Sequence, residues 1–191
     1  MTGGAAPGEK AELRRHFRQL RRQCLPAAAP GLQRAAANLA EKLPGDQRLG
    51  IYWPLAGEVD LLSIAQQPEL QQRLALPRVA EGQLRYRRWQ AGEALEPDDT
   101  QIPSPRQGPE LEPGTLGLLL VPALALDRRG IRLGYGGGWF DRLRSNPSWR
   151  AVPALAVLPA GCLVDILPSD PWDVPFSGWL DEHGPHWLQG V

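Results

Sequence analysis

The stretch Asp127-Arg-Arg-Gly-Ile-Arg-Leu-Gly-Tyr-Gly-Gly-Gly-Trp-Phe-Asp-Arg142 carries more structural information than any other part of the sequence. It holds four glycines within five positions, 134–138, flanked by Arg132 and Arg142. An apolar run at 116–121 precedes it, and residues 139–143 can begin a helix. Glycine lets a backbone approach a ligand closely, and arginine adds positive charge. The strand, the loop and the helix together therefore predict a phosphate-binding site.

The loop differs from the two best-known phosphate-binding motifs. The chain contains no Gly-x-x-x-x-Gly-Lys-Ser/Thr sequence. The spacing of residues 134–138 also lacks the last glycine position of the dinucleotide fingerprint, and no first strand stands near the N-terminus. A turn-rich connection with a mobile tip is the alternative interpretation. The coincidence of glycines, arginines and Asp141, a carboxylate able to hold a divalent cation, favours the phosphate site.

The composition narrows the class of protein further. A chain of 191 residues is expected to form one domain, and its 21 acidic and 21 basic side chains cancel. This balance argues against non-specific binding to nucleic acid or to an anionic membrane. Cys24 and Cys162 have neither disulfide nor metal-ligand spacing and are interpreted as packing residues. Without an apolar signal core or a membrane-length run, we expect a cytoplasmic monomer.

A helix is predicted from residue 9 to residue 24. Its apolar positions recur at spacings of four, three and four: Leu13, Phe17, Leu20 and Cys24. A row of cations borders this apolar stripe, about 85° around the helix: Lys10, Arg14, Arg18 and Arg21. We interpret Arg15, Arg18 and Arg22 as solvated, whereas Lys10 and Arg14 could reach a cleft beside the buried face.

The remaining elements alternate between strands and helices. Pro26 and Pro30 are expected to end the first helix, and a second helix is expected at 31–43. A further helix is expected from Asp60 through about Gln67, and no regular structure at 90–115. The expected strands are 48–53, 73–76 (closed by Pro77), 84–89, 116–121, 151–158 and 176–180.

This alternation favours an α/β fold: a three-layer α/β/α single domain with a largely parallel, Rossmann-like central sheet. We place this domain at residues 9–180. The segment 1–8, rich in glycine and alanine, is expected to be disordered, and residues 181–191 are expected to form a tail.

The strand and the glycine loop closely resemble the 5-formyltetrahydrofolate cyclo-ligase family, also called 5,10-methenyltetrahydrofolate synthetase. The family pattern is Pro-x-x-(Ala/Gly)-Phe-Asp followed by Gly-x-Arg-Leu-Gly-x-Gly-x-Gly-Tyr-Tyr-Asp. Residues 122–141 match it except at Leu126, Trp139 and Phe140. Three further segments are similar to the family and stand in its order: Lys10-Ala-Glu-Leu-Arg14, residues 52–60 and residues 167–175.

This resemblance implies an ATP-dependent ring closure. 5-Formyltetrahydrofolate and MgATP would give 5,10-methenyltetrahydrofolate, ADP and phosphate. Transfer of the γ-phosphoryl group to the formamide oxygen would make an iminium phosphate, which N10 attacks. Such chemistry asks the protein for positioning and charge neutralisation rather than for a nucleophile. The expected cofactors and partners are therefore ATP, Mg²⁺ and a reduced folate.

The resemblance also implies the site residues. The ATP contacts would be Lys10, Arg14, Arg132, Leu133, Gly134, Tyr135, Gly136, Gly137, Gly138, Trp139 and Phe140. The folate contacts would be Trp53, Glu58, Tyr135, Gly136, Gly137, Gly138 and Trp139. Asp141 and Asp173 would be the carboxylates that hold Mg²⁺.

Two departures from the family pattern leave other functions open. Trp139 and Phe140 keep an aromatic surface but lose two phenolic hydroxyls, and Trp53 is bulkier than the expected aliphatic residue. A non-catalytic nucleotide-binding module is one alternative. A sugar-phosphate isomerase or acyl-CoA transferase is another, and it would need a nucleophilic or proton-shuttling carboxylate. Glu58 distinguishes the ligase from the binding module, because its loss should impair folate use only in the ligase.

Overall fold

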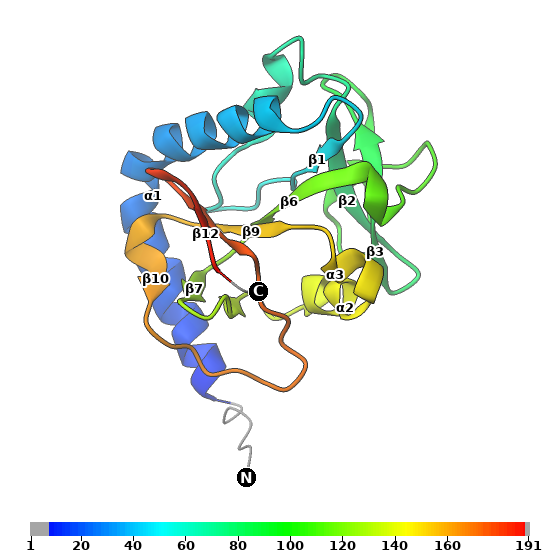
Figure 1. The fold of residues 1–191 in the computed structure, drawn as a ribbon. Helices are drawn as coiled ribbons and strands as arrows, with labels where there is room; N and C mark the ends of the chain where they lie inside the picture. Colours follow the sequence, from blue (N-terminus) through cyan, green and yellow to red (C-terminus); the bar gives the residue numbers. More distant parts are fainter. Residues whose placement is uncertain (1–7, 190–191) are drawn as a thin grey trace.

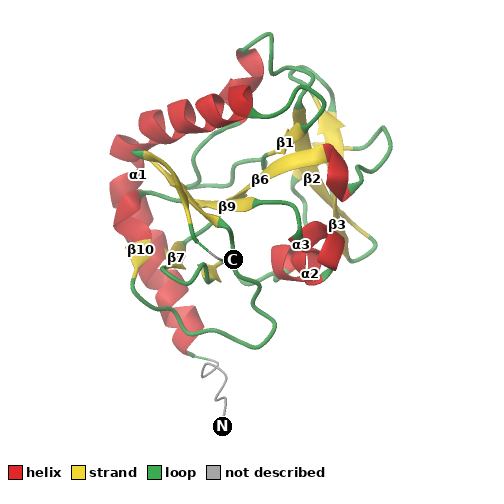
Figure 2. Cartoon of the chain, viewed as in Figure 1, coloured by secondary structure: helices red, strands yellow, loops and turns green. Residues whose placement is uncertain are grey.

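The computed structural model describes residues 8–189. Of the segment 1–8 that was predicted to be disordered, only Gly8 lies within the described residues. Its carbonyl oxygen accepts the backbone N–H of Glu12 at 3.1 Å, at the start of the first helix. The fold is built on one large sheet, with helices and smaller strand pairs around it (Figure 1 and Figure 2). None of the helices in this part of the chain is both long enough and apolar enough to cross a membrane.

The central sheet has seven strands in the order β12-β11-β9-β6-β1-β2-β3. Its five inner strands are parallel, and the edge strands β3 and β12 are antiparallel to their neighbours. The predicted largely parallel sheet is therefore confirmed. The strand bounds are β1 Arg48–Gly50, β2 Leu74–Ala80, β3 Gln83–Trp89, β6 Leu116–Pro122, β9 Ala154–Val157, β11 Gly178–Asp181 and β12 Gly184–Trp187.

The first helix does not end at the prolines, so the prediction of two helices is wrong. Helix α1 runs continuously over Glu9–Lys42, with Pro26 and Pro30 inside it. Figure 1 shows that its axis bends between the darker N-terminal half and the lighter C-terminal half. Both prolines are exposed. A helix can bend around its core when the missing hydrogen bonds fall on the solvent side.

The bend lets α1 contact both faces of the sheet. Its C-terminal half packs Leu32 and Ala36, both fully buried, with Leu120 and Leu155 of the sheet. Its N-terminal half contributes Phe17 to the core on the opposite face. The short helices α2 (Trp139–Ser145) and α3 (Pro147–Arg150) also lie on that second face. The central sheet thus lies between two helical layers.

Smaller elements complete the fold. β7 pairs with β8 and β10 in a second sheet, and β4 pairs with β5 in a hairpin. Their bounds are β4 Leu95–Pro97, β5 Pro103–Pro105, β7 Ala125–Asp127, β8 Arg132–Leu133 and β10 Leu163–Val164. The 3-10 helices are η1 Leu62–Gln66, η2 Pro113–Thr115 and η3 Ala160–Cys162.

Proline-rich segments account for two wrong predictions. β2 continues through Pro77 to Ala80, because its pairing with β1 involves only Leu74 and Ala75. A proline beyond that point removes no hydrogen bond to β1. Similarly, the segment 90–115 contains the β4–β5 hairpin, which has three prolines at its paired positions. A two-stranded hairpin tolerates proline where the N–H faces away from its partner.

The ends of other elements also differ from expectation. The helix expected through Gln67 is the 3-10 helix η1 of five residues. The predicted strand at 176–180 is found as β11, and it is followed by β12 within the expected tail. β12 forms the sheet edge through four residue pairs with β11. The segment 181–191 therefore adds a strand to the central sheet.

Candidate functional site

The glycine loop connects β8 to α2. The chain moves outward from β1 through β2 to β3, and then returns through β6 to the other side of β1. Open α/β sheets bind ligands beyond the carboxyl ends of their strands, at such a reversal of strand order. Tyr52 and Trp53 follow β1, and Pro122 ends β6. All three line one cavity beside the glycine loop.

We call this space the loop cavity, and its volume is about 230 Å³. Several residues that the family resemblance assigned to ligands line it: Trp53, Glu58, Tyr135, Gly137, Gly138, Trp139, Phe140 and Arg132. The rest of its wall is formed by Tyr52, Leu55, Pro77, Val79, Leu84, Asp98, Thr100, Ile102 and Pro122. The structure therefore brings the predicted folate segment around Glu58 next to the glycine loop.

The glycines of the loop adopt conformations that larger residues resist. Gly136 has a φ of 109° and Gly138 a φ of 64°, both in the left-handed region. A Cβ at Gly134 would lie 2.7 Å from Nη1 of Arg132. Arg14 of α1 donates from Nε to the Gly134 carbonyl oxygen at 3.0 Å. The predicted Arg14 thus lies against the loop and holds it to the first helix.

Two residues of the same sequence motif have structural roles. Leu133 is buried in the core, so only its backbone can face a ligand. The fully buried side chain of Asp127 accepts the backbone N–H groups of Arg129, Ile131 and Leu167. The backbone N–H of Gly130 also donates to the Asp127 carbonyl oxygen at 3.0 Å. Asp127 therefore organises the turn before the loop.

Some of the buried polar atoms without hydrogen-bond partners belong to residues of the loop cavity, and others, such as Tyr86 Oη and Arg144 Nε, lie elsewhere. Among the described residues, Glu58 Oε1, Tyr135 Oη and Arg132 Nε are such atoms, and all three residues line the cavity. Arg21 Nε, from α1, is a fourth. Buried polar groups in folded proteins almost always have a partner. Residues of the cavity wall thus carry both acceptors and donors whose hydrogen bonds are unmet.

Glu58 is the buried carboxyl group of this wall. It is 8% exposed, and its Oε2 accepts the backbone N–H of Leu55 at 2.8 Å. Burial raises its pKa above the ordinary value, whereas that hydrogen bond, the nearby Tyr135 hydroxyl and the charges of Arg21 and Arg132 oppose the rise. Burial and the nearby Glu58 carboxylate also raise the pKa of Tyr135, which therefore keeps its hydroxyl proton.

Arg132 supplies a buried cation to the cavity wall. Its side chain is 5% exposed and packs between the rings of Phe140 and Phe176, with its guanidinium carbon 5.4 Å from each ring centre. Nη1 donates to the Pro122 carbonyl oxygen at 3.1 Å. Burial lowers the pKa of Arg132, and the charge of Asp141, 3.6 Å from Nη2, opposes this. A desolvated guanidinium interacts strongly with a phosphate.

Lys10 and Asp173 lie together, although they are far apart in sequence. Lys10 Nζ is 2.7 Å from Asp170 Oδ2 and 2.8 Å from Asp173 Oδ2. Burial alone would lower the pKa of Lys10, but hydrogen bonds and charges from both aspartates raise it overall. These ion pairs fasten the start of α1 to the segment that precedes β11.

The two aspartates predicted to bind Mg²⁺ each lie beside a cation, Asp141 beside Arg132 and Asp173 beside Lys10. No group of three His, Cys, Asp or Glu side chains within residues 8–189 could hold a metal ion. The charges of Asp141 and Asp173 both act on the guanidinium of Arg132. Mg²⁺ is commonly held by one or two carboxylates, with water and phosphate oxygens completing its shell. The donor set therefore fits an ion that arrives with a nucleotide.

The aromatic pair that departs from the family pattern lies at the cavity wall. The guanidinium carbon of Arg142 is 4.3 Å from the ring centre of Trp139. A Cβ at Gly137 would lie 2.7 Å from Cδ1 of Trp139, so the glycine makes room for the indole. Both Trp139 and Phe140 line the cavity. They supply flat apolar surface where tyrosines would also supply hydroxyl groups.

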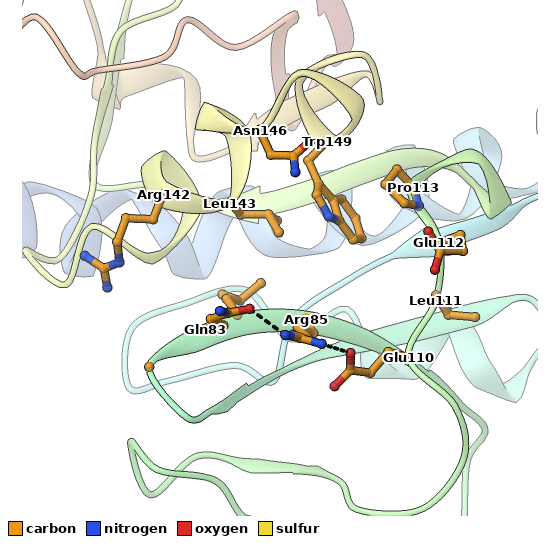
Figure 3. Close-up of a pocket in the computed structure, with 12 residues that line it drawn as sticks. Gln83, Arg85, Glu110, Leu111, Glu112, Pro113, Arg142, Leu143, Asn146 and Trp149 are labelled. Carbon is orange, nitrogen blue, oxygen red and sulfur yellow. Dashed lines mark hydrogen bonds and ion pairs between the residues drawn. The ribbon is translucent and has the colours of Figure 1, made fainter.

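Figure 3 shows a second cavity, which we call the hairpin cavity, with a volume of about 420 Å³. It lies between the β2–β3 turn, the segment 110–113 and the helices α2 and α3. Arg85 is bonded to Gln83 at 2.6 Å and also pairs with Glu110. Among the described residues, none that the resemblance assigned to a ligand lines it. We therefore place the candidate site in the smaller loop cavity.

The sequence missed residues that reach the site from other elements. Arg21 is 4% exposed, and its guanidinium carbon is 5.2 Å from the centre of the Tyr135 ring. It stands seven residues after Arg14, hence on the same face of α1, and this spacing was the available signal. Leu84, Asp98 and Ile102 join the wall through tertiary packing, which no local pattern announces.

The fold and the cavity define a mixed α/β protein with a small-molecule site at the reversal of strand order. A model of the 5-formyltetrahydrofolate cyclo-ligase family matches residues 6–179, and the chain belongs to this family.

Two curated 5-formyltetrahydrofolate cyclo-ligases show local similarity. The Mycolicibacterium smegmatis protein is 41% identical over 64 residues, and the Haemophilus influenzae protein is 42% identical over 62 residues. These alignments cover 34% and 31% of this chain and 32% of each relative. The chain thus aligns with about a third of the length of these relatives.

Two solved structures resemble the whole fold. The structure of Aquifex aeolicus 5,10-methenyltetrahydrofolate synthetase has a TM-score of 0.71 and 26% identity, and the match covers 95% of this chain and 94% of that one. The Mycoplasma pneumoniae 5,10-methenyltetrahydrofolate synthetase has a TM-score of 0.67 and 18% identity, covering 91% of this chain and 99% of that one. At this lower identity the likeness concerns the fold alone.

Proposed function

We propose that this chain catalyses the ATP-dependent conversion of 5-formyltetrahydrofolate to 5,10-methenyltetrahydrofolate, with release of ADP and phosphate. The observation that carries the proposal is the loop cavity. It joins a glycine loop and the buried cation Arg132 to a buried carboxylate with an unpartnered oxygen, Glu58 Oε1. Membership of the cyclo-ligase family supports the same activity.

The folate would bind through shape and through one charged acceptor. A reduced pterin presents N–H donors along one edge, and Glu58 Oε1 is a buried acceptor without a partner. Such a charge-assisted hydrogen bond would orient the ring. Trp53 and Trp139 offer apolar surface to the faces of the ring, and Tyr135, Gly137 and Gly138 form the adjacent wall. Gly136, also expected to contact the folate, stands between them in the sequence.

The nucleotide would bind along the loop, with its phosphates toward the cations. Arg132 lines the cavity, and Arg14 lies against the loop at Gly134. Lys10 completes this group from the start of α1 once its contacts with Asp170 and Asp173 rearrange. Arginine and lysine neutralise the charge of a triphosphate, which phosphoryl transfer requires. Residues 132–140 would therefore contact ATP with both backbone and side chains.

Ring closure needs the formyl oxygen converted into a leaving group. The formyl oxygen attacks the γ-phosphorus, an O–P bond forms, and the bond to the β-phosphate breaks to release ADP. The nitrogen N10 then attacks the formyl carbon, and the C–O bond breaks as phosphate leaves with the N10 proton. The protein orients the two reactants and stabilises the charge on the transferring group, and Arg132 is placed to do so.

Asp141 and Asp173 are the residues that would hold Mg²⁺. The ion would supply neutralisation of the phosphate charge when it is bound. Asp173 lies 2.8 Å from Lys10 Nζ, and Asp141 lies 3.6 Å from Arg132 Nη2, so each carboxylate now faces a cation instead. The monomeric state and the cytoplasmic location expected from the sequence stay predictions.

The test is to mix the protein with 5-formyltetrahydrofolate and MgATP, and to follow the absorbance of the methenyl product together with released phosphate. We expect both to rise in equal amounts, and both to need ATP. Asp141→Ala should abolish the rise, whereas Asp165→Ala should not, because Asp165 is exposed and pairs only with Arg128.

Each alternative function gives a different result in this assay. Binding of ATP without any methenyl product would support the nucleotide-binding module. Turnover of a sugar phosphate or an acyl-CoA without ATP would support the other enzyme classes. Either result would contradict the proposed ligase activity.

A further inference from the structure

Arg21 approaches the loop cavity from behind, through the N-terminal half of α1. Its side chain is buried, with 4% of the residue exposed. Nη1 donates to the Ala123 carbonyl oxygen at 3.2 Å, while Nε has no partner among the described residues. The guanidinium also lies over the ring of Tyr135, 5.2 Å from its centre. A buried cation with an unused donor therefore stands directly behind two residues of the cavity wall.

The space around Arg21 is too small to bind a ligand of its own. Arg21, Tyr52 and Glu58 line a void of about 10 Å³, and Tyr52, Glu58 and Pro122 also line the loop cavity. A void of this volume holds about one water molecule at most. Arg21 can therefore influence a substrate only through the residues between them.

We propose that Arg21 is a positioning residue that holds the Glu58 carboxylate ionised and the Tyr135 ring in place to receive the reduced pterin. This inference rests on the proposed function. A buried carboxylate is a strong acceptor only while it is charged, and a nearby guanidinium stabilises that charge. Arg21 supplies this charge from α1, whose other contributions to the void beside Glu58 are the apolar side chains of Leu25 and Leu32.

The groups that face Glu58 come from three elements. Arg132 and Tyr135 approach from β8 and the glycine loop that follows it, and Arg21 approaches from α1. The Leu55 N–H and the buried Tyr52 side chain belong to the same loop as Glu58. Burial raises the pKa of Glu58, and Arg21 and Arg132 act against this rise. Loss of the Arg21 charge therefore moves the titration of Glu58 to higher pH.

A purely structural arginine in this chain has a different pattern of contacts. Arg73 donates from Nη2 to the carbonyl oxygens of Leu43 and Pro44, at 2.7 and 2.8 Å, and is not among the described residues that line the loop cavity. Arg21 has one backbone acceptor and an aromatic ring. Arg73 is therefore the matched control for an effect on stability alone.

The test uses two substitutions that separate charge from hydrogen bonding. Arg21→Gln keeps a donor for Ala123 but removes the charge, whereas Arg21→Lys keeps the charge. Carbon-13 NMR of glutamate-labelled protein without ligand would follow the Glu58 carboxyl titration, assigned with Glu58→Gln. We expect the pKa of Glu58 to rise in Arg21→Gln and to stay close to its wild-type value in Arg21→Lys and in Arg73→Gln. An unchanged Glu58 titration in folded Arg21→Gln would overturn the proposal.

The same variants should change substrate binding with a characteristic pH dependence. The Kd of 5-formyltetrahydrofolate should rise about tenfold in Arg21→Gln at acidic pH, and less at alkaline pH where Glu58 ionises anyway. Arg73→Gln should lower the melting temperature without this dependence. A Kd that changes equally at every pH would show a structural role only and would overturn the proposal.

A measurement on the unmodified protein covers the case in which Arg21→Gln does not fold. The Arg21 Nε–H signal in nitrogen-15 NMR should move with pH at the midpoint of the Glu58 carboxyl, and this movement should vanish in Glu58→Gln. An Nε–H signal that ignores Glu58 would contradict the proposal. Because both NMR measurements need no turnover, they remain decisive even if the protein proves not to be a cyclo-ligase.

Discussion

The loop cavity and the hairpin cavity are neighbours that share the wall residue Leu84, yet they differ in chemistry. The hairpin cavity is larger, about 420 Å³ against about 230 Å³. In the loop cavity, Glu58, Arg132 and Tyr135 each have a buried polar atom without a partner. Among the described residues, no side chain that lines the hairpin cavity has such an atom.

We interpret the unsatisfied buried polar groups of the loop cavity, rather than the larger volume of the hairpin cavity, as the mark of the candidate site. In the hairpin cavity Arg85 and Glu110 pair with each other, and both are partly exposed. Such exposed ion pairs contribute little to the unfolding free energy, and they leave neither side chain without a partner. In the loop cavity, burial of the same residue types without full pairing costs stability, which a ligand can restore. Each cavity has a glycine, a glutamate and an arginine, so matched substitutions can test this comparison.

Substitution of Arg132 in the loop cavity and of Arg85 in the hairpin cavity should give the largest difference in kcat/KM. Arg132→Lys keeps the charge but loses the fork that contacts Pro122 and approaches Asp141. We expect kcat/KM to fall about 100-fold or more, as for other buried groups that stabilise charge in a transition state. Arg85→Lys in the hairpin cavity should change kcat/KM less than about twofold. Steady-state kinetics with both variants checks this, and equal losses would remove the distinction between the cavities.

The glutamate pair should separate substrate binding from nucleotide binding. Glu58→Gln replaces a charged acceptor by a neutral one, and hydrogen bonds to charged groups contribute about 1.5–3 kcal/mol. The KM for 5-formyltetrahydrofolate should therefore rise about 10- to 100-fold, while the Kd of ATP stays unchanged. Glu110→Gln should leave both values as they are, because Glu110 pairs with Arg85 and Arg87 outside the loop cavity. A normal folate KM in Glu58→Gln would refute the assigned role.

The glycine pair should show equal costs in stability but unequal costs in activity. Gly138 and Gly82 have φ values of 64° and 74°, so alanine at either position costs about 1 kcal/mol in unfolding free energy. A Cβ at Gly138 would lie 3.0 Å from Arg142 Nη1, whereas a Cβ at Gly82 meets nothing within 4 Å. We expect a several-fold loss of kcat/KM only in Gly138→Ala. Urea unfolding and kinetics together check this; lost activity in Gly82→Ala would count against it.

The smallest expected effect is a pH dependence of stability caused by Glu58. Burial raises its pKa in the folded protein, so the folded state holds this proton more tightly than the unfolded chain. Ionisation of Glu58 therefore lowers the unfolding free energy as the pH rises through the raised pKa. Urea unfolding of wild type and Glu58→Gln between about pH 4 and pH 8 should show their difference growing with pH in favour of the variant. A constant difference would mean that Glu58 titrates normally.

The sequence predicted the parts of the site that lie close together in the chain. The spacing of glycines and arginines at 132–142 indicated the loop, and the apolar run at 116–121 indicated the adjacent strand β6. Trp53 and Glu58 were placed with the loop by family resemblance, and the structure brings them to the same cavity. Local pattern and resemblance thus supplied the glycine loop, Trp53 and Glu58, but not the remaining residues of the wall.

The sequence could not predict features that depend on packing between distant segments. Pro26 and Pro30 normally end a helix, and only the exposed outer side of the bend in α1 allows them to remain inside it. Arg21 lies in a row of cations in which Arg18 is exposed and Lys10 and Arg14 are half-buried, and only its packing against Ala123 and Tyr135 buries it. Ile102 reaches the cavity only through the β4–β5 hairpin.

The central claim is that the reduced folate binds in the loop cavity rather than in the larger hairpin cavity. The most direct measurement is a crystal structure of the protein with 5-formyltetrahydrofolate and a non-hydrolysable ATP analogue. We predict the pterin edge within hydrogen-bond distance of Glu58 Oε1, with the triphosphate along residues 134–138. A pterin bound beside Arg85 in the hairpin cavity, with the loop cavity free of ligand, would contradict the claim.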